Sequence, residues 1–211
     1  SAQDLKTAFA ENSYGKNVTA KTSEVASDNG AILAINGDYY GARESGYVIR
    51  NGVLYRQDAR DNRRCLAIYD DGRFEIVAEE KVTALELLND HAVHVLSFGS
   101  SLIENGVITA GDRSEIMDTT VPHNNPRTVL AMIDPLHYIF CVVDGRTDVS
   151  RGMKLADLAV FLKGLGCKEA YNLDGGGTSW MYFQGEVINH PSDGHYYGER
   201  SVSDIVCITK G

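Results

Sequence analysis

A glycine-rich segment between two apolar stretches carries the densest set of chemically useful groups in the chain. It reads Asn-Leu-Asp-Gly-Gly-Gly-Thr-Ser and spans residues 172–179. Three successive glycines let the backbone turn and expose its N–H groups, directly after a carboxylate and before two hydroxyls. Such a convergence between buried strands is typical of a binding or catalytic site, and the alternative is a flexible hairpin with an aspartate in its turn. The candidate site residues of this segment are Asn172, Asp174, Gly175, Gly176, Gly177, Thr178 and Ser179.

Further polar residues lie where other predicted strands begin or end. They are Asn36 and Asp38 after the apolar run 31–35, Asp144 and Arg146 after the run 137–143, and Arg127 before the run 129–133. If these strand ends meet at one edge of a sheet, carboxylates and arginines converge there. Carboxylates suit acid/base or nucleophilic work on a glycosidic bond, and arginines suit a phosphate because one guanidinium binds two of its oxygens. The combination indicates a substrate that contains both a sugar and a phosphate.

The composition limits the class of the protein and its partners. The chain has 211 residues, enough for one domain, and its 43% hydrophobic and 23% charged residues are ordinary for a globular protein. The net charge of −9 argues against a general nucleic-acid binder and requires that locally placed arginines meet any anionic substrate. No apolar run approaches the length of a membrane span. The four cysteines are not at metal-ligand spacing, so we expect mostly free thiols, no metal site and no cofactor.

Hydrophobic patterning predicts many strands and few helices. Leucines at helical spacing predict a helix over 154–165, and shorter helices are expected over 23–28, capped by Thr22 or Ser23, and over 81–90. Asn-Gly or Asp-Gly turns within 47–56, 65–77 and 102–109 indicate hairpins. We therefore predict an α+β fold, a mixed and largely antiparallel sheet with hairpins and at least one packed helix.

Five motifs along the chain match a known pattern. They are Asn36-Gly37-Asp38-Tyr39-Tyr40, Asn125-Pro126-Arg127-Thr128, Val143-Asp144-Gly145-Arg146, the segment 172–179, and Glu199-Arg200-Ser201-Val202-Ser203. In this order and spacing they resemble the phosphodiester glycosidase family over roughly residues 20–210, and the Asn-Leu-Asp-Gly-Gly-Gly motif is highly specific. The resemblance implies a single phosphodiester glycosidase domain over 1–211 that lacks a first strand found in relatives.

The resemblance also implies an activity. It is the hydrolysis of a sugar-1-phosphodiester, of the N-acetylglucosamine-1-phosphodiester kind, at the glycosidic bond, which frees the sugar and leaves a phosphomonoester. The expected partner is a sugar phosphodiester or phosphoglycan, with no nucleic acid and no membrane span, and bacterial relatives imply a location outside the cytoplasm. Two alternatives stay open: a non-catalytic phosphoglycan-binding module, and a metal-dependent phosphodiesterase that cleaves the P–O bond.

Roles carry over from the family position by position. Asp174 and Asp144 share the acid/base or nucleophile roles, without a division between them, and Arg127 is the phosphate clamp. The substrate-binding set is Asn36, Asp38, Arg146, Asn172, Gly175, Gly176, Gly177, Thr178, Ser179 and Arg200. Three of these depart from the family pattern, because Asp38 stands where many relatives have Gly, Arg146 where animal members have Gln, and Thr178 where Ser is commoner.

Each of these residues also has an ordinary structural alternative. An aspartate at a strand end is often a turn or cap residue, and an arginine often pairs with a structural carboxylate. The additional candidates for lining the site are His123, His190 and His195, and Tyr40 and Tyr197 are candidates for sugar stacking rather than packing.

Overall fold

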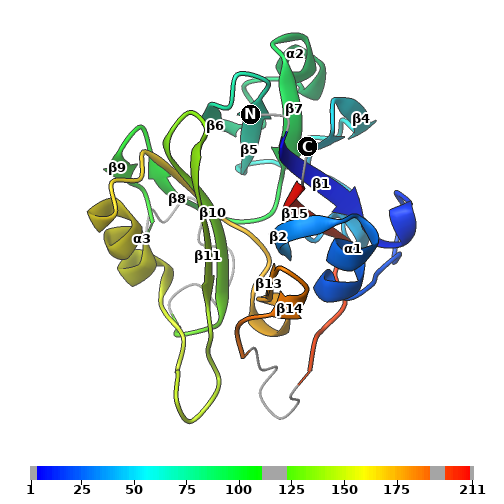
Figure 1. Ribbon diagram of the computed structural model, residues 1–211. Helices are drawn as coiled ribbons and strands as arrows, with labels where there is room; N and C mark the ends of the chain where they lie inside the picture. Colours follow the sequence, from blue (N-terminus) through cyan, green and yellow to red (C-terminus); the bar gives the residue numbers. More distant parts are fainter. Residues whose placement is uncertain (1–3, 111–122, 191–197, 210–211) are drawn as a thin grey trace.

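The computed structural model describes residues 4–110, 123–190 and 198–209, which form three five-stranded sheets (Figure 1). Every strand pair within these residues is antiparallel. The predicted α+β class with largely antiparallel strands is confirmed, and the strands are divided among three sheets. Residues 111–122 and 191–197, which include His195 and Tyr197, lie outside the described residues.

The strands of each sheet come from distant parts of the sequence. In spatial order, the first sheet contains β1 (Leu5–Phe9), β15 (Asp204–Thr209), β2 (Ala31–Asn36), β13 (Met181–Phe183) and β14 (Glu186–Val187). The second contains β11 (His137–Val143), β10 (Arg127–Asp134), β12 (Glu169–Asn172), β8 (Ser101–Glu104) and β9 (Val107–Ile108). The third contains β4 (Val53–Arg56), β3 (Val48–Arg50), β7 (Ala92–Leu96), β5 (Arg64–Tyr69) and β6 (Phe74–Ala78). The predicted hairpins are confirmed as β3–β4, β5–β6 and β8–β9.

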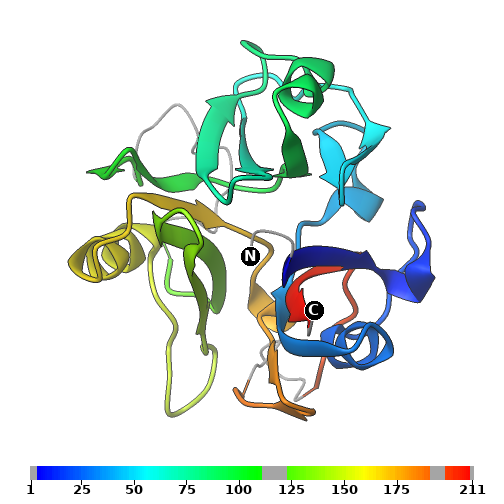
Figure 2. The same cartoon turned by 45° about the horizontal axis from the view of Figure 1, so that its top comes forward.

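The three sheets surround one hydrophobic core (Figure 2). Each sheet contributes large side chains to it, for example Ile35 from the first, Leu130 from the second and Leu66 from the third. Because both faces of these strands are buried, their sequences are continuous apolar runs rather than alternating ones. This explains why the patterning identified the strands.

One α-helix covers the outer face of each sheet. These helices are α1 (Thr22–Asp28) on the first sheet, α3 (Leu155–Gly164) on the second and α2 (Ala84–Asn89) on the third. The leucine stripe of α3 is buried against β8 and β10, as its spacing predicts. Among the described residues, no helix has the length and apolar character needed to cross a membrane.

The ends of the two short helices differ from the prediction. Thr83 caps α2 by accepting from Glu86 N, so this helix begins later than residue 81. Lys21, and neither Thr22 nor Ser23, is the N-cap residue of α1. Ser23 instead donates from its backbone N and its Oγ to the carboxylate of Glu199, at 2.7 and 2.6 Å, which anchors the segment that precedes β15. All four cysteines are free thiols.

Candidate active site

The predicted polar strand ends meet at one place in the structure. In the second sheet Arg127 pairs with Val143 and Val129 pairs with Asn172, so the start of β10 lies beside the ends of β11 and β12. The end of β2 reaches the same place from the first sheet through Asn36. Two sheets therefore bring their polar ends together at the junction between them.

The side chain of Asn36 links the two sheets at this junction. Its side chain is fully buried, its Nδ2 donates to the backbone oxygen of Asp174 at 2.7 Å, and its Oδ1 accepts from Thr128 Oγ1 at 2.7 Å. The backbone at Asp174 is thus tied to β2 and β10. Asn36 is a positioning residue for the aspartate.

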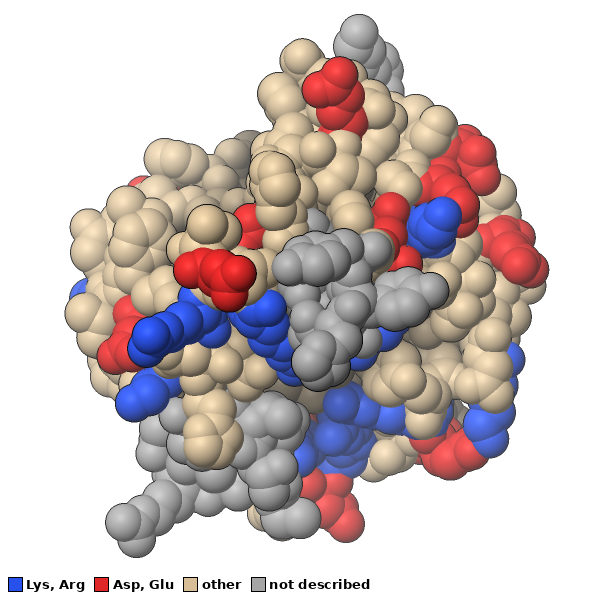
Figure 3. Space-filling model, turned by 90° about the horizontal axis from the view of Figure 1, so that it is seen from below, with Lys and Arg blue, Asp and Glu red and all other residues tan. Residues whose placement is uncertain are grey.

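A cavity of about 240 Å³ opens at these strand ends. Its lining residues are Arg43, Arg60, Arg63, Phe98, Gly99, Ser100, Asn125, Pro126, Arg127, Arg146, Leu155, Asn172, Leu173, Asp174, Gly175, Gly176 and Arg200. Among the described residues that line it, six are arginines and one, Asp174, is a carboxylate, although the whole chain is acidic. Figure 3 looks onto this end of the molecule, where basic side chains gather near the middle of the face. The cavity is suited to an anion.

Asp174 is held at the wall of this cavity. Its side chain is 13% exposed, and its Oδ1 accepts from the backbone N of Gly175 at 2.9 Å. Burial raises the pKa of Asp174 above its usual value, and the charge of Arg200 is the largest opposing influence. A partly desolvated carboxylate of raised basicity is suited to take a proton or to attack an electrophile.

The glycines allow close approach at the site. After Asp174 the chain makes a single 3₁₀ turn, η4 (Gly176–Thr178). A Cβ on Gly175 would lie 2.9 Å from the backbone oxygen of Pro126. Gly176 has φ +70°, and a Cβ there would lie 3.2 Å from Nη1 of Arg146. Glycine is therefore needed at position 175 for close contact with the residue before β10, and at position 176 to leave room for the guanidinium of Arg146.

The backbone N–H groups of Gly175 and Gly176 are hydrogen-bonded within the protein. The backbone N of Gly175 bonds to Asp174 Oδ1, and that of Gly176 bonds to the backbone oxygen of Pro126 at 3.1 Å. These two amides hold the aspartate and the turn in place. Thr178 and Ser179 are buried behind the turn, where Thr178 Oγ1 donates to the backbone oxygen of Gly175 at 2.9 Å, and neither side chain lines the cavity.

The three predicted arginines reach the cavity, each from a fixed position. Arg127 is 6% exposed and donates to the backbone oxygens of Met153 and His123, at 3.1 and 2.9 Å. Arg146 donates from Nε and Nη2 to Asn125 Oδ1, at 3.3 and 3.1 Å. These contacts set the direction of each guanidinium before a ligand binds.

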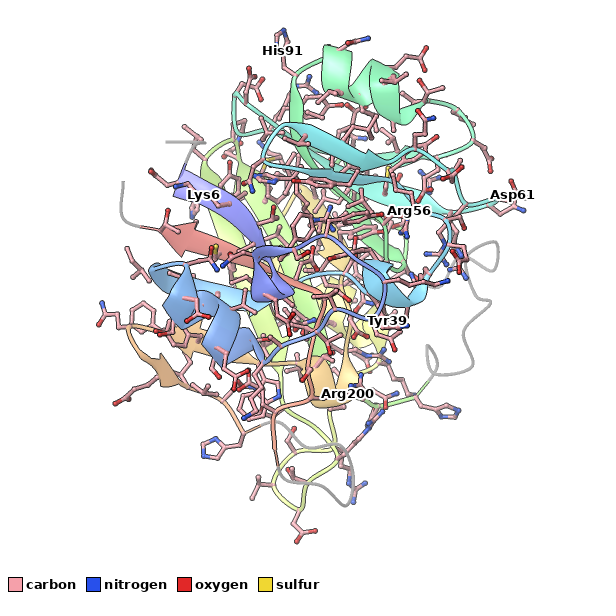
Figure 4. The ribbon with its side chains drawn as sticks, turned by 90° about the vertical axis from the view of Figure 1, so that its right-hand side faces the viewer. Lys6, Tyr39, Arg56, Asp61, His91 and Arg200 are labelled. Carbon is pink, nitrogen blue, oxygen red and sulfur yellow. The ribbon has the colours of Figure 1, made fainter. Side chains whose placement is uncertain are left out.

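Arg200 lies beside the η4 turn (Figure 4). Its Nη2 donates to the backbone oxygen of Gly175 at 3.1 Å and lies 3.8 Å from Oδ2 of Asp174. The preceding residue, Glu199, is fixed by Ser23 of α1. Ser23, which is distant from the glycine turn in the sequence, therefore helps to position this arginine through Glu199.

Sequence reasoning missed three further arginines of the cavity, Arg43, Arg60 and Arg63. They lie outside the recognised motifs, on the segments between β2 and β5. Arg43 Nη1 and Arg60 Nη1 both donate to the backbone oxygen of Phe98, at 2.9 and 3.0 Å. The concentration of arginines at positions 56, 60, 63 and 64 of an acidic chain marked the region of Arg60 and Arg63, and no such signal marked Arg43.

Two predicted aspartates are not among the described residues that line the cavity. The first, Asp38, is buried, and its Oδ2 accepts from Arg50 Nη2 at 2.8 Å and from the backbone N of Ser97 at 3.0 Å. Arg50 is itself buried and donates from Nε to Asp204 Oδ2 at 2.7 Å. This ion triad joins the first and third sheets, so the structure gives Asp38 a structural place.

The second, Asp144, supports a loop. Its Oδ1 accepts from Asn189 Nδ2 at 2.8 Å and its Oδ2 accepts from the backbone N of His190 at 3.0 Å. Both contacts tie the end of β11 to the segment after β14. The imidazole rings of His123 and His190 are not among the described groups that line the cavity. The backbone oxygen of His123 accepts from Arg127, and the backbone N of His190 donates to Asp144.

Tyr40 packs inside the protein. Its ring stacks on that of Tyr14, with centroids 5.1 Å apart, and meets Phe9 edge-on at 5.5 Å. Burial raises the pKa of its hydroxyl far above the usual value. The structure therefore places Tyr40 in internal aromatic packing and not at a position for stacking on a sugar.

Comparison with curated proteins identifies relatives that are longer than this chain. The prophage-derived uncharacterised protein YomE of Bacillus subtilis is 30% identical over 186 residues, covering 85% of this chain and 28% of that protein. The mouse N-acetylglucosamine-1-phosphodiester alpha-N-acetylglucosaminidase is 28% identical over 208 residues, covering 90% of this chain and 40% of that enzyme. The chain thus spans less than half the length of both relatives.

Solved structures share the fold at lower identity. The zebrafish N-acetylglucosamine-1-phosphodiester alpha-N-acetylglucosaminidase catalytic domain, auto-inhibited by its pro-peptide, matches with a TM-score of 0.82 at 22% identity, covering 100% of this chain and 74% of that chain. A putative exported protein of Burkholderia pseudomallei matches with a TM-score of 0.71 at 15% identity, covering 98% and 71%. The sequence profile of the phosphodiester glycosidases matches residues 29–209, which is most of the chain. This chain therefore belongs to the phosphodiester glycosidase family.

Proposed function

We propose that this protein hydrolyses a sugar-1-phosphodiester at the glycosidic C–O bond, releasing the free sugar and a phosphomonoester. The observation that carries the proposal is the composition of the cavity, in which Asp174 is the carboxylate among six arginines. Membership of the family and the name of the mouse relative support a substrate of the N-acetylglucosamine-1-phosphodiester class.

The charge change of the reaction fits this cavity. A phosphodiester carries one negative charge, and cleavage at the sugar carbon leaves the bonding electron pair on the phosphate, which becomes a monoester with a second ionisation near pH 6. Negative charge therefore grows on the leaving group as the bond breaks. Arg127, Arg146 and Arg200 stabilise that growing charge more strongly than the ground state, which is the requirement for catalysis.

One carboxylate, that of Asp174 among the described lining residues, is sufficient for this route. A departing phosphate is a weak base, so it leaves without protonation by a general acid, whereas an alkoxide expelled from phosphorus needs one. Asp174 then acts on the sugar side. It either takes a proton from the water that attacks the anomeric carbon or attacks that carbon itself, and the anomer of the product distinguishes the two.

Asp144 acts in this proposal as a positioning residue. Its carboxylate is occupied by Asn189 and His190, so it fixes the loop after β14 beside the end of β11. In this proposal Asp174 is therefore the carboxylate that takes part in the chemical step. We further propose a location outside the cytoplasm, supported by the name of the structural neighbour from Burkholderia pseudomallei.

The test uses the methyl diester of N-acetylglucosamine-1-phosphate with and without EDTA. The proposal predicts free N-acetylglucosamine and methyl phosphate at a rate that the chelator does not change. N-acetylglucosamine-1-phosphate as product, or loss of activity with EDTA, would instead indicate a metal-dependent phosphodiesterase. Binding without turnover would indicate a phosphoglycan-binding module.

A further inference from the structure

The cavity holds more positive charge than one phosphodiester needs. Arg127, Arg146 and Arg200 lie around the glycine turn, within reach of the phosphate whose bond is broken. Arg43, Arg60 and Arg63 line the same cavity from the side of Phe98. The described residues thus place two groups of three arginines at the cavity.

The second group is held together against electrostatic repulsion. Burial, followed by the charges of Arg43 and Arg63, lowers the pKa of Arg60 below its usual value. The guanidinium of Arg43 lies over the ring of Phe98, 4.6 Å from its centroid, and shares the backbone oxygen of Phe98 with Arg60. Packing and one shared neutral acceptor thus fix two like charges side by side.

Two members of this group, Arg43 and Arg60, are not held by ion pairs among the described residues. Within the described residues, neither Arg43 nor Arg60 has a carboxylate at ion-pair distance from its guanidinium. The buried Glu79 accepts from the backbone N of Arg60 rather than from its side chain, and its other oxygen meets Ser97 Oγ. An anionic ligand would relieve the repulsion among these guanidinium groups.

We propose that Arg43, Arg60 and Arg63 form a second anion subsite, which binds a second phosphate on the leaving group of the substrate. This inference rests on the proposed function and defines its substrate class: a sugar-1-phosphoryl group followed by a further phosphate. Arg43 also lowers the pKa of Asp174, so the field of the second group extends to the reacting carboxylate. The second phosphate is either joined directly, as in a diphosphate, or carried by the next unit of a phosphodiester chain.

The test compares two substrates that differ by one phosphate. These are the methyl ester of N-acetylglucosamine-1-phosphate and the methyl ester of N-acetylglucosamine-1-diphosphate. The wild-type protein should show at least about tenfold higher kcat/KM for the diphosphate, because charge-assisted hydrogen bonds to one further phosphate add to binding. A two-unit phosphodiester oligomer, assayed beside them, distinguishes a directly joined second phosphate from one in the next unit.

The matched variants are Arg60→Gln and Arg43→Gln, each of which keeps a donor for the backbone oxygen of Phe98. Each should raise KM for the preferred substrate roughly tenfold or more and reduce kcat/KM for the single-phosphate substrate by a clearly smaller factor. The control is Arg73→Gln, which removes an arginine of the β5–β6 hairpin whose partners are Asp71, Glu75 and Asp90. Arg73→Gln should leave KM and kcat/KM unchanged for both substrates.

The subsite and the proposed function fail in different ways. Equal kcat/KM for one and two phosphates in the wild-type protein, or equal losses for both in Arg60→Gln, would overturn the subsite and leave the glycosidase intact. If no substrate is hydrolysed, calorimetry with methyl diphosphate and methyl phosphate tests the subsite alone. Tighter binding of the diphosphate, lost in Arg60→Gln, would support it, and equal binding of both would overturn it.

Discussion

Nη2 of Arg200 lies 3.8 Å from Oδ2 of Asp174, close enough for its charge to oppose the effect of burial on the carboxyl pKa. Burial raises the pKa of Asp174, and Arg200 lowers it again. The pH at which this carboxylate ionises therefore depends on its burial and, in the opposite direction, on a residue that follows it by 26 positions.

Arg200→Gln tests this relationship through the pH dependence of activity. Asp174 acts in its ionised form, so activity is present above its pKa and is lost as the pH falls through it. Removing the cation should raise that pKa further and move the acidic limb of kcat/KM to higher pH, in addition to any loss in rate. Arg73→Gln is the control for a change in net charge. An acidic limb that stays in place or moves to lower pH would contradict the assignment.

Asp144→Asn should leave substantial activity. Asn keeps an oxygen that can accept from Asn189 or from the backbone N of His190, so we expect kcat/KM to fall about tenfold or less and stability to fall by about 1 kcal/mol. Steady-state kinetics and urea unfolding measure the two effects. A fall in kcat/KM of a thousandfold or more with unchanged stability would indicate that Asp144 takes part in the chemical step.

Gly176→Ala should affect both the backbone and Arg146. Its φ of +70° costs a residue with a Cβ about 1–2 kcal/mol, and the new methyl would press on the guanidinium. Gly30→Ala is a matched control, because Gly30 has φ +62° and no atom within 4 Å of the added Cβ. Both variants should lose similar stability, while Gly176→Ala alone should raise KM several-fold. Equal KM values for the two variants would contradict the inference that Gly176 leaves room for the guanidinium of Arg146.

Arg50→Met tests the structural place of Asp38. Without Arg50, two buried carboxylates lose the cation between them, so the free energy of unfolding should fall by roughly 3–5 kcal/mol. Arg73→Met, at the surface, should cost less than about 1 kcal/mol. Urea denaturation compares them, and a small loss for Arg50→Met would show that the triad does not hold the sheets together.

The sequence predicted those parts of the fold that depend on local patterns. Continuous apolar runs identified β2, β10 and β11, leucine spacing identified α3, and turn residues identified three hairpins. The division of strands among three sheets depends on pairings between distant segments, such as β1 with β15, which local patterns do not encode.

The site was predictable to the extent that it lies in strand-end motifs. Asp174, Arg127, Arg146 and Arg200, which come from four of the five motifs, line one cavity. Arg43, Arg60 and Arg63 enter it from loops whose path is set by tertiary packing, and no local pattern shows where they point. Asp38 could not be separated from the site residues because its partners, Arg50 and Asp204, lie 12 and 166 positions further along the chain.

The most direct test of the account is hydrolysis in H₂¹⁸O by the wild-type protein and by Asp174→Asn. The substrate is the methyl diester of N-acetylglucosamine-1-phosphate, and mass spectrometry locates the label. The account predicts ¹⁸O in the released sugar and none in the phosphate, with turnover reduced about 100-fold to 10,000-fold in Asp174→Asn while methyl phosphate still binds. Label in the phosphate, or near-normal turnover by the variant, would contradict it.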